Sequence, residues 1–350
     1  MNTQSSKMLS VIIPTYGRAN DLKATVKSIL NQSLEDFEII IVDNEQAISS
    51  SDQVTELVQQ EKKIHYVQIK LSGVTYARSI GNLLATGEII LQIDDDVSLL
   101  DVDCLKKIVN LFKSSEIDVI GVLELHSEAD VESFLAKQSV YSDGDMINQF
   151  ENTKIGQLGG YYNITTGFEK LLDQPQGIYP IQSFRSCFMA YRKSVLSKLK
   201  NWDSNYCTVG SRIGVREETD FLLRCRNAGY KIYYTNITAI WHRAGDRDKS
   251  LIVRERGIKR HFYYAAGHSY MAMKDMIETG QFLKIIPWFI YQMLWGSYKN
   301  PGLFKVIYHN HSLSGSVFNI MGFIGGILFA LSHKRKILTD FNNYINTLEP

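Results

Sequence analysis

The sequence contains little cysteine and little proline, almost no net charge, and no apolar run long enough for an unambiguous membrane span. Its four cysteines among 350 residues show neither paired nor metal-type spacing, so they indicate reduced thiols and argue against a disulfide framework. A net charge of +1 points to no polyanionic partner, and we expect no nucleic acid to bind. The first nine residues are polar and lead directly into an apolar run. This start predicts no secretory signal peptide and a cytoplasmic location.

What the sequence does contain is typical of a folded globular protein. Hydrophobic residues make up 45% and charged residues 21% of the chain, which supports an ordinary packed core and excludes a largely disordered chain. A length of 350 residues fits two domains, or one large domain with an appendage.

Apolar runs alternate with amphipathic helical patterns through the first third of the chain. We predict strands at 9–13, 37–42, 64–67, 89–93 and 118–123, and helices at 19–31, 52–60, 76–84 and 103–113. Pro14 is expected to end the first strand, and Thr75 to cap the helix at 76–84. The alternation predicts an α/β fold with a mostly parallel sheet flanked by helices.

Polar residues follow three of these strands directly. They are the segments Pro14-Thr15-Tyr16, Asp43-Asn44 and Asp94-Asp95-Asp96. Ligands of open α/β sheets bind beyond the carboxyl ends of the strands. We therefore expect these three segments to meet at one edge and to build one site.

The three consecutive aspartates give the strongest chemical signal. Neighbouring carboxylates repel and raise one another's pKa unless a cation compensates. A divalent ion such as Mg²⁺ takes oxygen ligands and commonly joins one or two carboxylates to substrate phosphates. The alternative for an isolated acidic triplet is a solvated turn.

The pattern changes after Glu124. Residues 124–181 lose periodicity and are rich in Gly and Tyr, which predicts an insertion that either shapes a second-substrate pocket or is only a surface excursion. We then expect a strand at 184–191, helices at 193–200 and 216–228, a strand at 232–234 and another ending at His242. Gly229 is expected to stop the second helix.

The last hundred residues are helical and apolar in pattern. Residues 282–295 and 316–331 are apolar runs, and the second is followed by the basic segment 333–336. Both runs fall at or below the length that a membrane-spanning helix needs. We therefore favour peripheral membrane contact through 282–336, with the basic residues facing lipid headgroups. The alternatives are a helical pair packed on the protein and a transmembrane hairpin.

An ordered series of motifs resembles the large family of inverting nucleotide-sugar glycosyltransferases, family two, with the GT-A fold. The resemblance covers roughly residues 9–242. The matching segments are Val11-Ile12-Ile13-Pro14-Thr15-Tyr16-Gly17-Arg18, Ile41-Val42-Asp43-Asn44, Ala77-Arg78-Ser79-Ile80-Gly81-Asn82, Gly87-Glu88 ahead of Asp94-Asp95-Asp96, Arg192-Lys193-Ser194-Val195-Leu196, Trp202-Asp203, and Glu217-Glu218-Thr219-Asp220-Phe221-Leu222-Leu223-Arg224 before Ala228-Gly229-Tyr230.

The resemblance implies how a nucleoside-diphosphate sugar would be held. In similar enzymes the tip after the first strand and the acid after the second bind the nucleoside, and an arginine such as Arg78 faces the nucleotide through its planar donor fork. The implied donor-binding residues are Pro14, Thr15, Tyr16, Arg18, Asp43, Arg78, Asp94 and Asp95. Packing at a strand end, a turn cap and a surface ion pair are the alternatives for Tyr16, Asp43 and Arg78.

The resemblance also implies a cofactor, Mn²⁺ or Mg²⁺. Asp96 corresponds to the direct metal ligand, Asp94 points to ribose or metal, and Asp95 is assigned to orienting the donor sugar. His242 is either a further metal or phosphate ligand or a histidine packed beside Trp241. The metal would offset the charge on the departing nucleoside diphosphate.

Inversion requires a base that deprotonates the acceptor hydroxyl. The family pattern has Glu-Asp at this place, with Asp as the base, whereas this chain has Glu217 and Glu218. We favour Glu218, then Glu217, then Asp220. On a regular helix these three side chains cannot all point to the same side. The alternative is an acidic first turn that only favours the helix dipole.

These implications predict a glycosyltransferase domain at 1–250 and a helical, membrane-associated region at 251–350. Within the domain, 1–123 would bind nucleotide and 124–250 would bind acceptor and carry the base. The acceptor is expected to be a saccharide or lipid-linked saccharide in polysaccharide or glycolipid assembly. The alternatives are another metal-dependent nucleotide enzyme such as a nucleotidyltransferase, a glycoside hydrolase with a carboxylate pair, and a non-catalytic nucleotide-sugar-binding protein.

Overall fold

The fold was analysed in a computed structural model of the whole chain. The structure describes residues 8–44, 61–70, 73–114, 116–137, 160–163, 168–171, 176–184, 187–207, 213–243, 259–296, 302–304 and 313–339. The helix predicted at 52–60 and most of the insertion at 124–181 lie outside these ranges.

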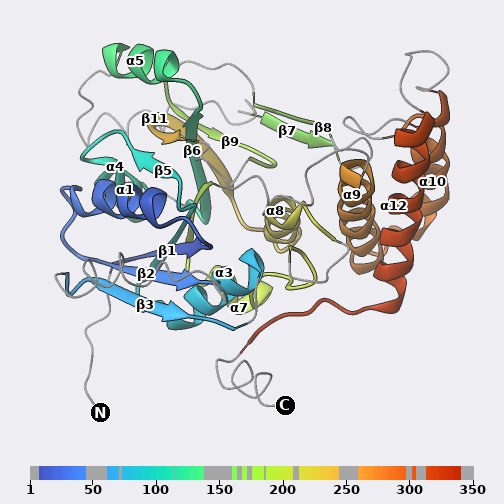
Figure 1. The fold of residues 1–350 in the computed structure, drawn as a ribbon, viewed down its shortest axis with the longest axis horizontal. Helices are drawn as coiled ribbons and strands as arrows, with labels where there is room; N and C mark the ends of the chain where they lie inside the picture. Colours follow the sequence, from blue (N-terminus) through green and yellow to red (C-terminus); the bar gives the residue numbers. More distant parts are fainter. Residues whose placement is uncertain are drawn as a thin grey trace.

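A nine-stranded mixed sheet forms the centre of the molecule, with helices on both faces (Figure 1). Its order is β3-β2-β1-β4-β10-β6-β11-β5, with β9 paired to β11. The strands are β1 (Leu9–Thr15), β2 (Phe37–Asp43), β3 (Ile64–Gln68), β4 (Ile89–Ile93), β5 (Val97–Leu99), β6 (Val119–Leu125), β9 (Ile178–Pro180), β10 (Phe188–Arg192) and β11 (Ile232–His242). Strands β1–β4 pair in parallel, β10 runs antiparallel between β4 and β6, and β6 and β11 are parallel.

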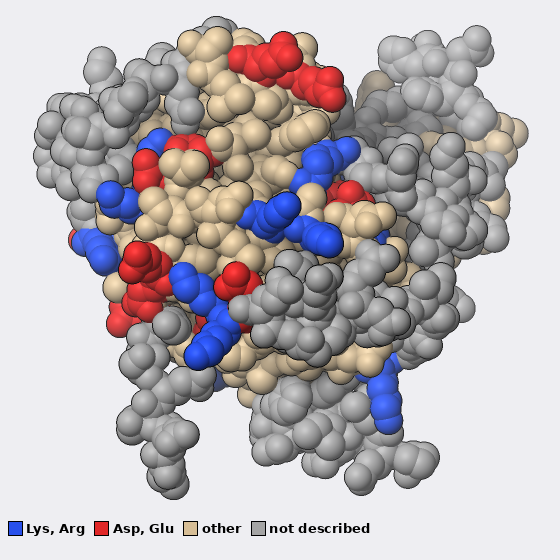
Figure 2. Space-filling view, turned by 60° about the vertical axis from the view of Figure 1, so that its left-hand side comes forward, with Lys and Arg blue, Asp and Glu red and all other residues tan. Residues whose placement is uncertain are grey.

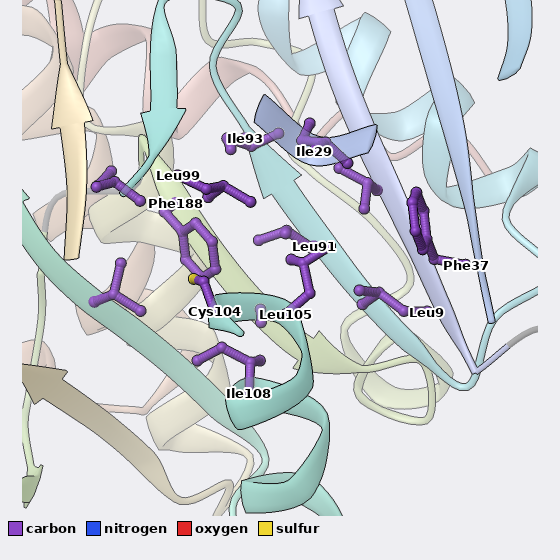
Figure 3. Close-up of a cluster of buried hydrophobic side chains, with 14 of the residues drawn as sticks. Leu9, Ile29, Phe37, Leu91, Ile93, Leu99, Cys104, Leu105, Ile108 and Phe188 are labelled. Atoms are coloured by element: carbon purple, nitrogen blue, oxygen red, sulfur yellow. The ribbon is translucent and has the colours of Figure 1, made fainter. Parts of the chain in front are cut away.

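Alternation along the strands divides the apolar residues between two cores. In β1, Val11 and Ile13 face one core, whereas Ile12 faces the other, as the period of two in a strand requires. The first core packs against α1 (Ala19–Leu30) and α4 (Cys104–Ser114), and Figure 3 shows part of it. The second packs against α3 (Val74–Leu84), α7 (Val195–Leu199) and α8 (Glu217–Asn227). The predicted α/β class is confirmed.

Several predicted element ends are corrected. Strand β1 continues through Pro14 to Thr15. Proline is tolerated there because the pairing of β1 with β4 ends at Ile12, and Pro14 lies beyond it. Thr75 does not cap α3: its hydroxyl donates to the Tyr206 carbonyl at 2.7 Å, and Gly73 occupies the N-cap.

The described elements of the insertion are α5 (Glu128–Lys137), a hairpin of β7 (Gly160–Asn163) and β8 (Phe168–Leu171), and the short strand β9. The strand predicted at 184–191 starts later, at Phe188. Gly229 follows α8 with a φ of 86°, a left-handed conformation that glycine adopts without strain, as predicted.

The two strands predicted at 232–234 and before His242 are one strand, β11. Its pairing with β6 is interrupted: Thr235 pairs with Val122, and the next pair is Ala239 with Leu123. Residues 236–238 therefore form a bulge, which Gly177 holds by donating its N–H to the Asn236 side chain at 2.7 Å. This bulge resets which residues of β6 lie beside the end of β11.

Three helices form the C-terminal part: α9 (Lys259–Glu278), α10 (Ile285–Leu294), which a short 3₁₀ turn η1 (Phe282–Lys284) precedes, and α12 (Leu313–Ser332). They stand beside the sheet in Figure 1. Helix α12 packs closely on α9. Gly322 and Gly326 allow this close approach, because a Cβ at either position would overlap the backbone of α9. A third apolar core joins these helices to Tyr206, Ile213 and Leu223.

Helix α12 extends beyond the apolar run predicted at 316–331. The helix has 20 residues rather than the 16 of its apolar run, and by length and composition it is the one candidate membrane span among the described residues. Part of it is buried on α9, and a core helix of a soluble protein passes the same test. An exposed apolar stripe remains along its other side: Leu313, Val317, Met321, Ile324, Leu328 and Leu331.

The basic segment after α12 also differs from its prediction. Arg335 does not face outward: it reaches Asp220 at 2.6 Å, Glu278 at 2.7 Å and Asp203 at 3.3 Å. Residues on both sides fix this tail to the core, since the Lys336 carbonyl accepts from the Ser204 N–H and Asp203 bridges to Ile337. In Figure 1 the tail runs back from α12 beneath α8.

Buried polar contacts also fix the first strands. Glu38 of β2 is buried and accepts hydrogen bonds from the Ser10 hydroxyl at 2.6 Å and from the N–H and hydroxyl of Thr86 at 2.7 Å. Burial alone would raise the pKa of Glu38, but these hydrogen bonds lower it. On the surface, basic and acidic side chains are interspersed over the face shown in Figure 2, in keeping with the small net charge.

Candidate active site

The predicted meeting of the three polar segments is found. Thr15 lies beside Asp43 in the pairing of β1 and β2, and Asp94 follows the end of β4 on the other side of β1. The acidic triplet is a turn between β4 and β5, and β5 pairs antiparallel with the end of β11. That pairing sets His242 opposite Val97 and so brings it to the aspartates. The sequence did not predict β5.

Asp94, Asp96 and His242 form a compact group. Their potential ligand atoms all lie within 4.8 Å of one another. Asp96 Oδ1 lies 3.3 Å from His242 Nε2, and the Arg243 N–H donates to the Asp96 carbonyl at 2.9 Å. Burial would raise the pKa of Asp96, but His242 and Arg18 lower it, so the carboxylate is ionised.

Asp95 has a different environment from its neighbours. It is buried, its Oδ2 accepts from the Thr15 hydroxyl at 2.8 Å, and its Oδ1 pairs with Arg18 at 2.7 Å. Burial raises the pKa of Asp95 to about 7 in spite of these partners. Both oxygens thus tie the aspartate turn to β1 and to Arg18, whereas the sequence assigned Asp95 to the donor sugar.

Two arginines offset part of the negative charge. Arg18 bridges Asp95 and Asp96, each at 2.7 Å. Arg78, on α3, is 2% exposed, contacts Asp94 at 3.1 Å and Glu218 at 3.7 Å, and lies over the Trp202 ring. Arg78 is therefore no surface ion pair. Its Nη2 contacts both Asp94, in the aspartate turn, and Glu218, in the first turn of α8.

The three acids of α8 do not all point to the same side, as helix geometry predicted. Glu218 faces Arg78 and keeps a side-chain exposure of 30%. Glu217 accepts a hydrogen bond from the Cys207 thiol at 3.3 Å. Asp220 is buried and pairs with Arg224 at 2.9 Å and Arg335 at 2.6 Å, which lower its pKa against the effect of burial. Asp220 thus lies on the side of α8 away from Arg78.

The predicted nucleoside-binding residues lie at the strand ends. Pro14 and Thr15 end β1, and Tyr16 follows with 41% exposure. Asp43 is fully buried and accepts from the Tyr66 hydroxyl at 2.6 Å. The exposed ring of Tyr16 is available to a ligand at this edge, whereas the Asp43 carboxylate lies beneath the surface.

Glu124, in β6, lies at the site and was not among the predicted site residues. Its Oε1 lies 2.5 Å from Nδ1 of His242 and 3.3 Å from Nε2 of His126. The two carboxylates Asp96 and Glu124 raise the pKa of His242 to about 10. A signal existed: Glu124 follows a buried apolar run, as Asp43 and Asp94 do, and β6 ends beside β11.

The donor set suits a divalent cation. Asp96 Oδ1 is buried and has no well-aligned hydrogen bond from the described residues, and His242 Nε2 lies 3.3 Å from it. Two carboxylates and an imidazole offer oxygen and nitrogen ligands of the kind that Mn²⁺ accepts, while Mg²⁺ more strictly prefers oxygen. The residues present therefore fit a metal held by Asp94, Asp96 and His242.

A family model identifies the chain. Residues 10–200 match the model described as glycosyl transferase family 2, which covers the sheet from β1 to β10 and all three aspartates. The chain belongs to glycosyl transferase family 2. The resemblance to this family that its motifs indicate is confirmed, and so is the fold expected with it.

Solved glycosyltransferases share this fold. The mannosyltransferase PcManGT from Pyrobaculum calidifontis, solved in complex with GDP-Man and Mn²⁺, aligns over 94% of this chain and 88% of its own, with a TM-score of 0.50 and 13% identity. GalNAc-T7, solved with UDP, GalNAc and Mn²⁺, aligns over 82% of this chain and 58% of its own, with a TM-score of 0.53 and 13% identity. At such identities the likeness concerns the fold.

Sequence relatives of this family 2 glycosyltransferase match over shorter stretches. The GalNAc(5)-diNAcBac-PP-undecaprenol beta-1,3-glucosyltransferase of Campylobacter jejuni is 35% identical over 94 residues, 26% of this chain and 30% of that protein. The minor teichoic acid biosynthesis protein GgaA of Bacillus subtilis is 30% identical over 132 residues, 36% of this chain and 29% of that protein. The chain spans between 13 and 35% of the length of the curated relatives it matches.

Proposed function

We propose that this glycosyltransferase transfers a sugar, with inversion and with the help of a divalent cation, from a nucleoside diphosphate to an acceptor hydroxyl. One observation carries the proposal. Asp94, from the metal-type group of Asp94, Asp96 and His242, and the candidate base Glu218 both contact the same nitrogen, Nη2, of the buried Arg78 guanidinium. Groups for the leaving diphosphate and for the attacking hydroxyl are thus neighbours.

The donor half of the proposal concerns the strand ends. Tyr16, with Pro14 and Thr15 behind it, and Asp43 would bind the nucleoside at the ends of β1 and β2. Asp94, Asp96 and His242 would hold Mn²⁺ or Mg²⁺, which when bound offsets charge on a departing diphosphate. The Mn²⁺ and nucleotide ligands of the two structural neighbours support this assignment.

The acceptor half concerns α8. Glu218 would take the proton of the acceptor hydroxyl as that oxygen attacks, because its carboxylate is partly exposed and lies beside the donor site through Arg78. Arg78, 3.7 Å from this carboxylate, would orient it. Glu217 is the second candidate. Asp220 is a poor one, because its carboxylate is buried in ion pairs.

The acceptor itself is proposed as a saccharide or lipid-linked saccharide of polysaccharide or glycolipid assembly. The names of two relatives support this, one acting on an undecaprenol-linked saccharide and one in teichoic acid biosynthesis. The exposed stripe on α12 supports peripheral contact with a membrane, at its cytoplasmic face, within 282–336. Residues 1–250 would form the catalytic domain, in halves 1–123 and 124–250, with 251–350 as the helical region.

The first test is a thermal-shift screen of nucleoside diphosphates with and without Mn²⁺ or Mg²⁺. A ligand that binds only the folded protein raises its melting temperature. The expected result is one diphosphate whose stabilisation requires the cation and is lost in Asp96→Asn. The control Asp130→Asn, exposed on α5, should behave as wild type. A cation-independent shift, preserved in Asp96→Asn, would remove the metal from the proposal.

The second test concerns the base and the stereochemistry. Glu218→Gln should stop transfer while leaving the cation-dependent diphosphate shift intact, and Glu217→Gln should retain activity. If only Glu217→Gln stops transfer, the base is Glu217. The anomeric configuration of the fresh product, read by proton NMR, decides inversion: retention of the donor configuration would refute it.

A further inference from the structure

We propose that Glu124 is a positioning residue for His242: its carboxylate holds Nδ1 and thereby directs Nε2 toward Asp94 and Asp96. The inference rests on the proposed function, because it concerns the metal site proposed there. Glu124 Oε1 lies 2.5 Å from Nδ1, while Nε2, on the opposite side of the ring, lies 3.3 Å from Asp96 Oδ1. The imidazole therefore stands between two carboxylates, one of them in the metal-type group.

The bulge in β11 makes this contact possible. If the register of Thr235 with Val122 continued unbroken, Glu124 would pair with Ile237, five residues before His242. An odd separation puts two side chains on opposite faces of a sheet. With residues 236–238 bulged out, Glu124 pairs instead with Ile240. His242 is two residues further along, so the two side chains lie on the same face and meet diagonally.

The carboxylate of Glu124 is itself held in place. Its side chain is 12% exposed, His126 lies 3.3 Å from the same Oε1, and the Cys187 thiol is a close neighbour of the carboxylate. A carboxylate fixed in this way is a directional acceptor rather than a diffuse charge. It can therefore fix the orientation of the His242 ring as well as the nitrogen that carries the proton.

The chemical effect follows from the two nitrogens of histidine. A metal ligand must present a nitrogen without its proton, and the other nitrogen then keeps the proton. An ionised carboxylate only accepts hydrogen bonds, so Glu124 favours the proton on Nδ1 and leaves Nε2 free for a cation. Without Glu124, Asp96 would compete for the proton on Nε2 and turn a ligand into a hydrogen-bond donor. Loss of such outer partners typically weakens metal binding by about 10–100-fold.

The test measures Mn²⁺ affinity directly, with the full chain and no substrate, by the electron paramagnetic resonance signal of free Mn²⁺. Glu124→Ala should raise the Kd for Mn²⁺ about 10–100-fold. Glu124→Gln should lose less, because its amide oxygen still accepts from Nδ1. His126→Gln, the matched control at the same oxygen, should change the Kd less than about twofold, and urea unfolding should show that all three variants fold.

A double-mutant cycle distinguishes positioning from a general structural effect. In a His242→Asn background, Glu124→Ala should add no further loss of affinity. A full additional loss would show that Glu124 acts without His242 and overturn the inference. An equal loss in His126→Gln would also overturn it, in favour of a separate cation site at Glu124, His126 and His242.

The cycle also separates this inference from the proposed function. If His242→Asn weakens Mn²⁺ binding and Glu124→Ala does not, only the positioning role fails. If His242→Asn has no effect while Asp96→Asn abolishes binding, His242 is no ligand and the positioning role fails with it. If Asp96→Asn also binds Mn²⁺ as wild type does, the metal site itself is wrong.

Discussion

Replacing Arg335 by methionine should destabilise the whole protein, although this residue lies 15 positions from the end of the chain. The guanidinium contacts the carboxylates of Asp203, Asp220 and Glu278, and the first two are buried. Arg335→Met keeps most of the side-chain volume and removes the charge. It therefore leaves two buried carboxylates with Arg224 as their remaining close cation among the described residues.

The magnitude can be worked from these contacts. Removing one partner of a buried ion pair typically costs about 3–5 kcal/mol, because the other charge stays buried. Asp220 keeps Arg224 at 2.9 Å, and Asp203 keeps the Tyr270 hydroxyl at 2.7 Å and two backbone N–H groups. Because these partners remain, we expect a loss at the lower end of this range, about 3 kcal/mol. The free energy of unfolding of a protein is typically about 5–15 kcal/mol.

The loss should depend on pH. Burial and the neighbouring Asp220 already raise the pKa of Asp203, and removing Arg335 raises it further. A carboxyl whose folded pKa exceeds its unfolded value costs stability at higher pH, and the cost disappears as the group takes up its proton. The deficit of Arg335→Met should therefore be largest near pH 7–8 and smaller near pH 5.

The assay is urea unfolding followed by circular dichroism at several pH values. Lys334→Met, an exposed neighbour in the same tail, is the matched control and should stay within about 0.5 kcal/mol of wild type. A loss below about 1 kcal/mol in Arg335→Met, or a deficit that grows toward pH 5, would refute the reasoning.

Three further predictions concern other parts of the fold. Glu38→Gln should cost about 1–3 kcal/mol in urea unfolding at pH 7, since a charged acceptor of three hydrogen bonds is lost. Burial acts to raise the pKa of Glu38 but hydrogen bonds lower it, so the wild-type advantage should shrink as pH falls below about 4, and a constant difference would contradict the argument. Gly81→Ala should cost about 1–3 kcal/mol, because a Cβ there overlaps the Ile12 side chain under α3; an unchanged melting curve would show that α3 moves away at no cost. Leu328→Glu, in the exposed stripe of α12, should leave stability unchanged but lower co-sedimentation with anionic phospholipid vesicles about tenfold; undiminished binding would mean that the stripe does not contact lipid.

Local pattern was sufficient for much of the fold and for the position of the site. The strands ending at Thr15, Asp43 and Ile93 are mostly apolar runs with polar residues at or directly after their ends, and parallel pairing then puts those residues at one edge. Helix α8 was predictable from its apolar residues and from Gly229. These features depend on neighbours within a few residues, which a sequence shows directly.

Features that depend on distant parts of the chain were not predictable. Strand β5 has three residues, too few for a periodic signal. It forms because it pairs with the end of β11, which lies far away in the sequence. Arg335 was predicted to face lipid headgroups with the rest of its basic segment, because its partners Asp203 and Asp220 lie more than a hundred residues away. Glu124 was predicted as the first residue of the insertion, because its place beside His242 depends on the register of β6 and β11.

The bulge at 236–238 absorbs changes in the length of β11 without changing which residues meet beyond it. Thr235 pairs with Val122 before the bulge and Ala239 with Leu123 after it, so a strand without these three residues would still pair Ile240 with Glu124. Beyond the bulge no such freedom exists, because side chains alternate along the strand. In relatives that keep both side chains, length should therefore vary between the positions of 235 and 239, whereas one residue inserted between 240 and 242 would put Glu124 and His242 on opposite faces of the sheet.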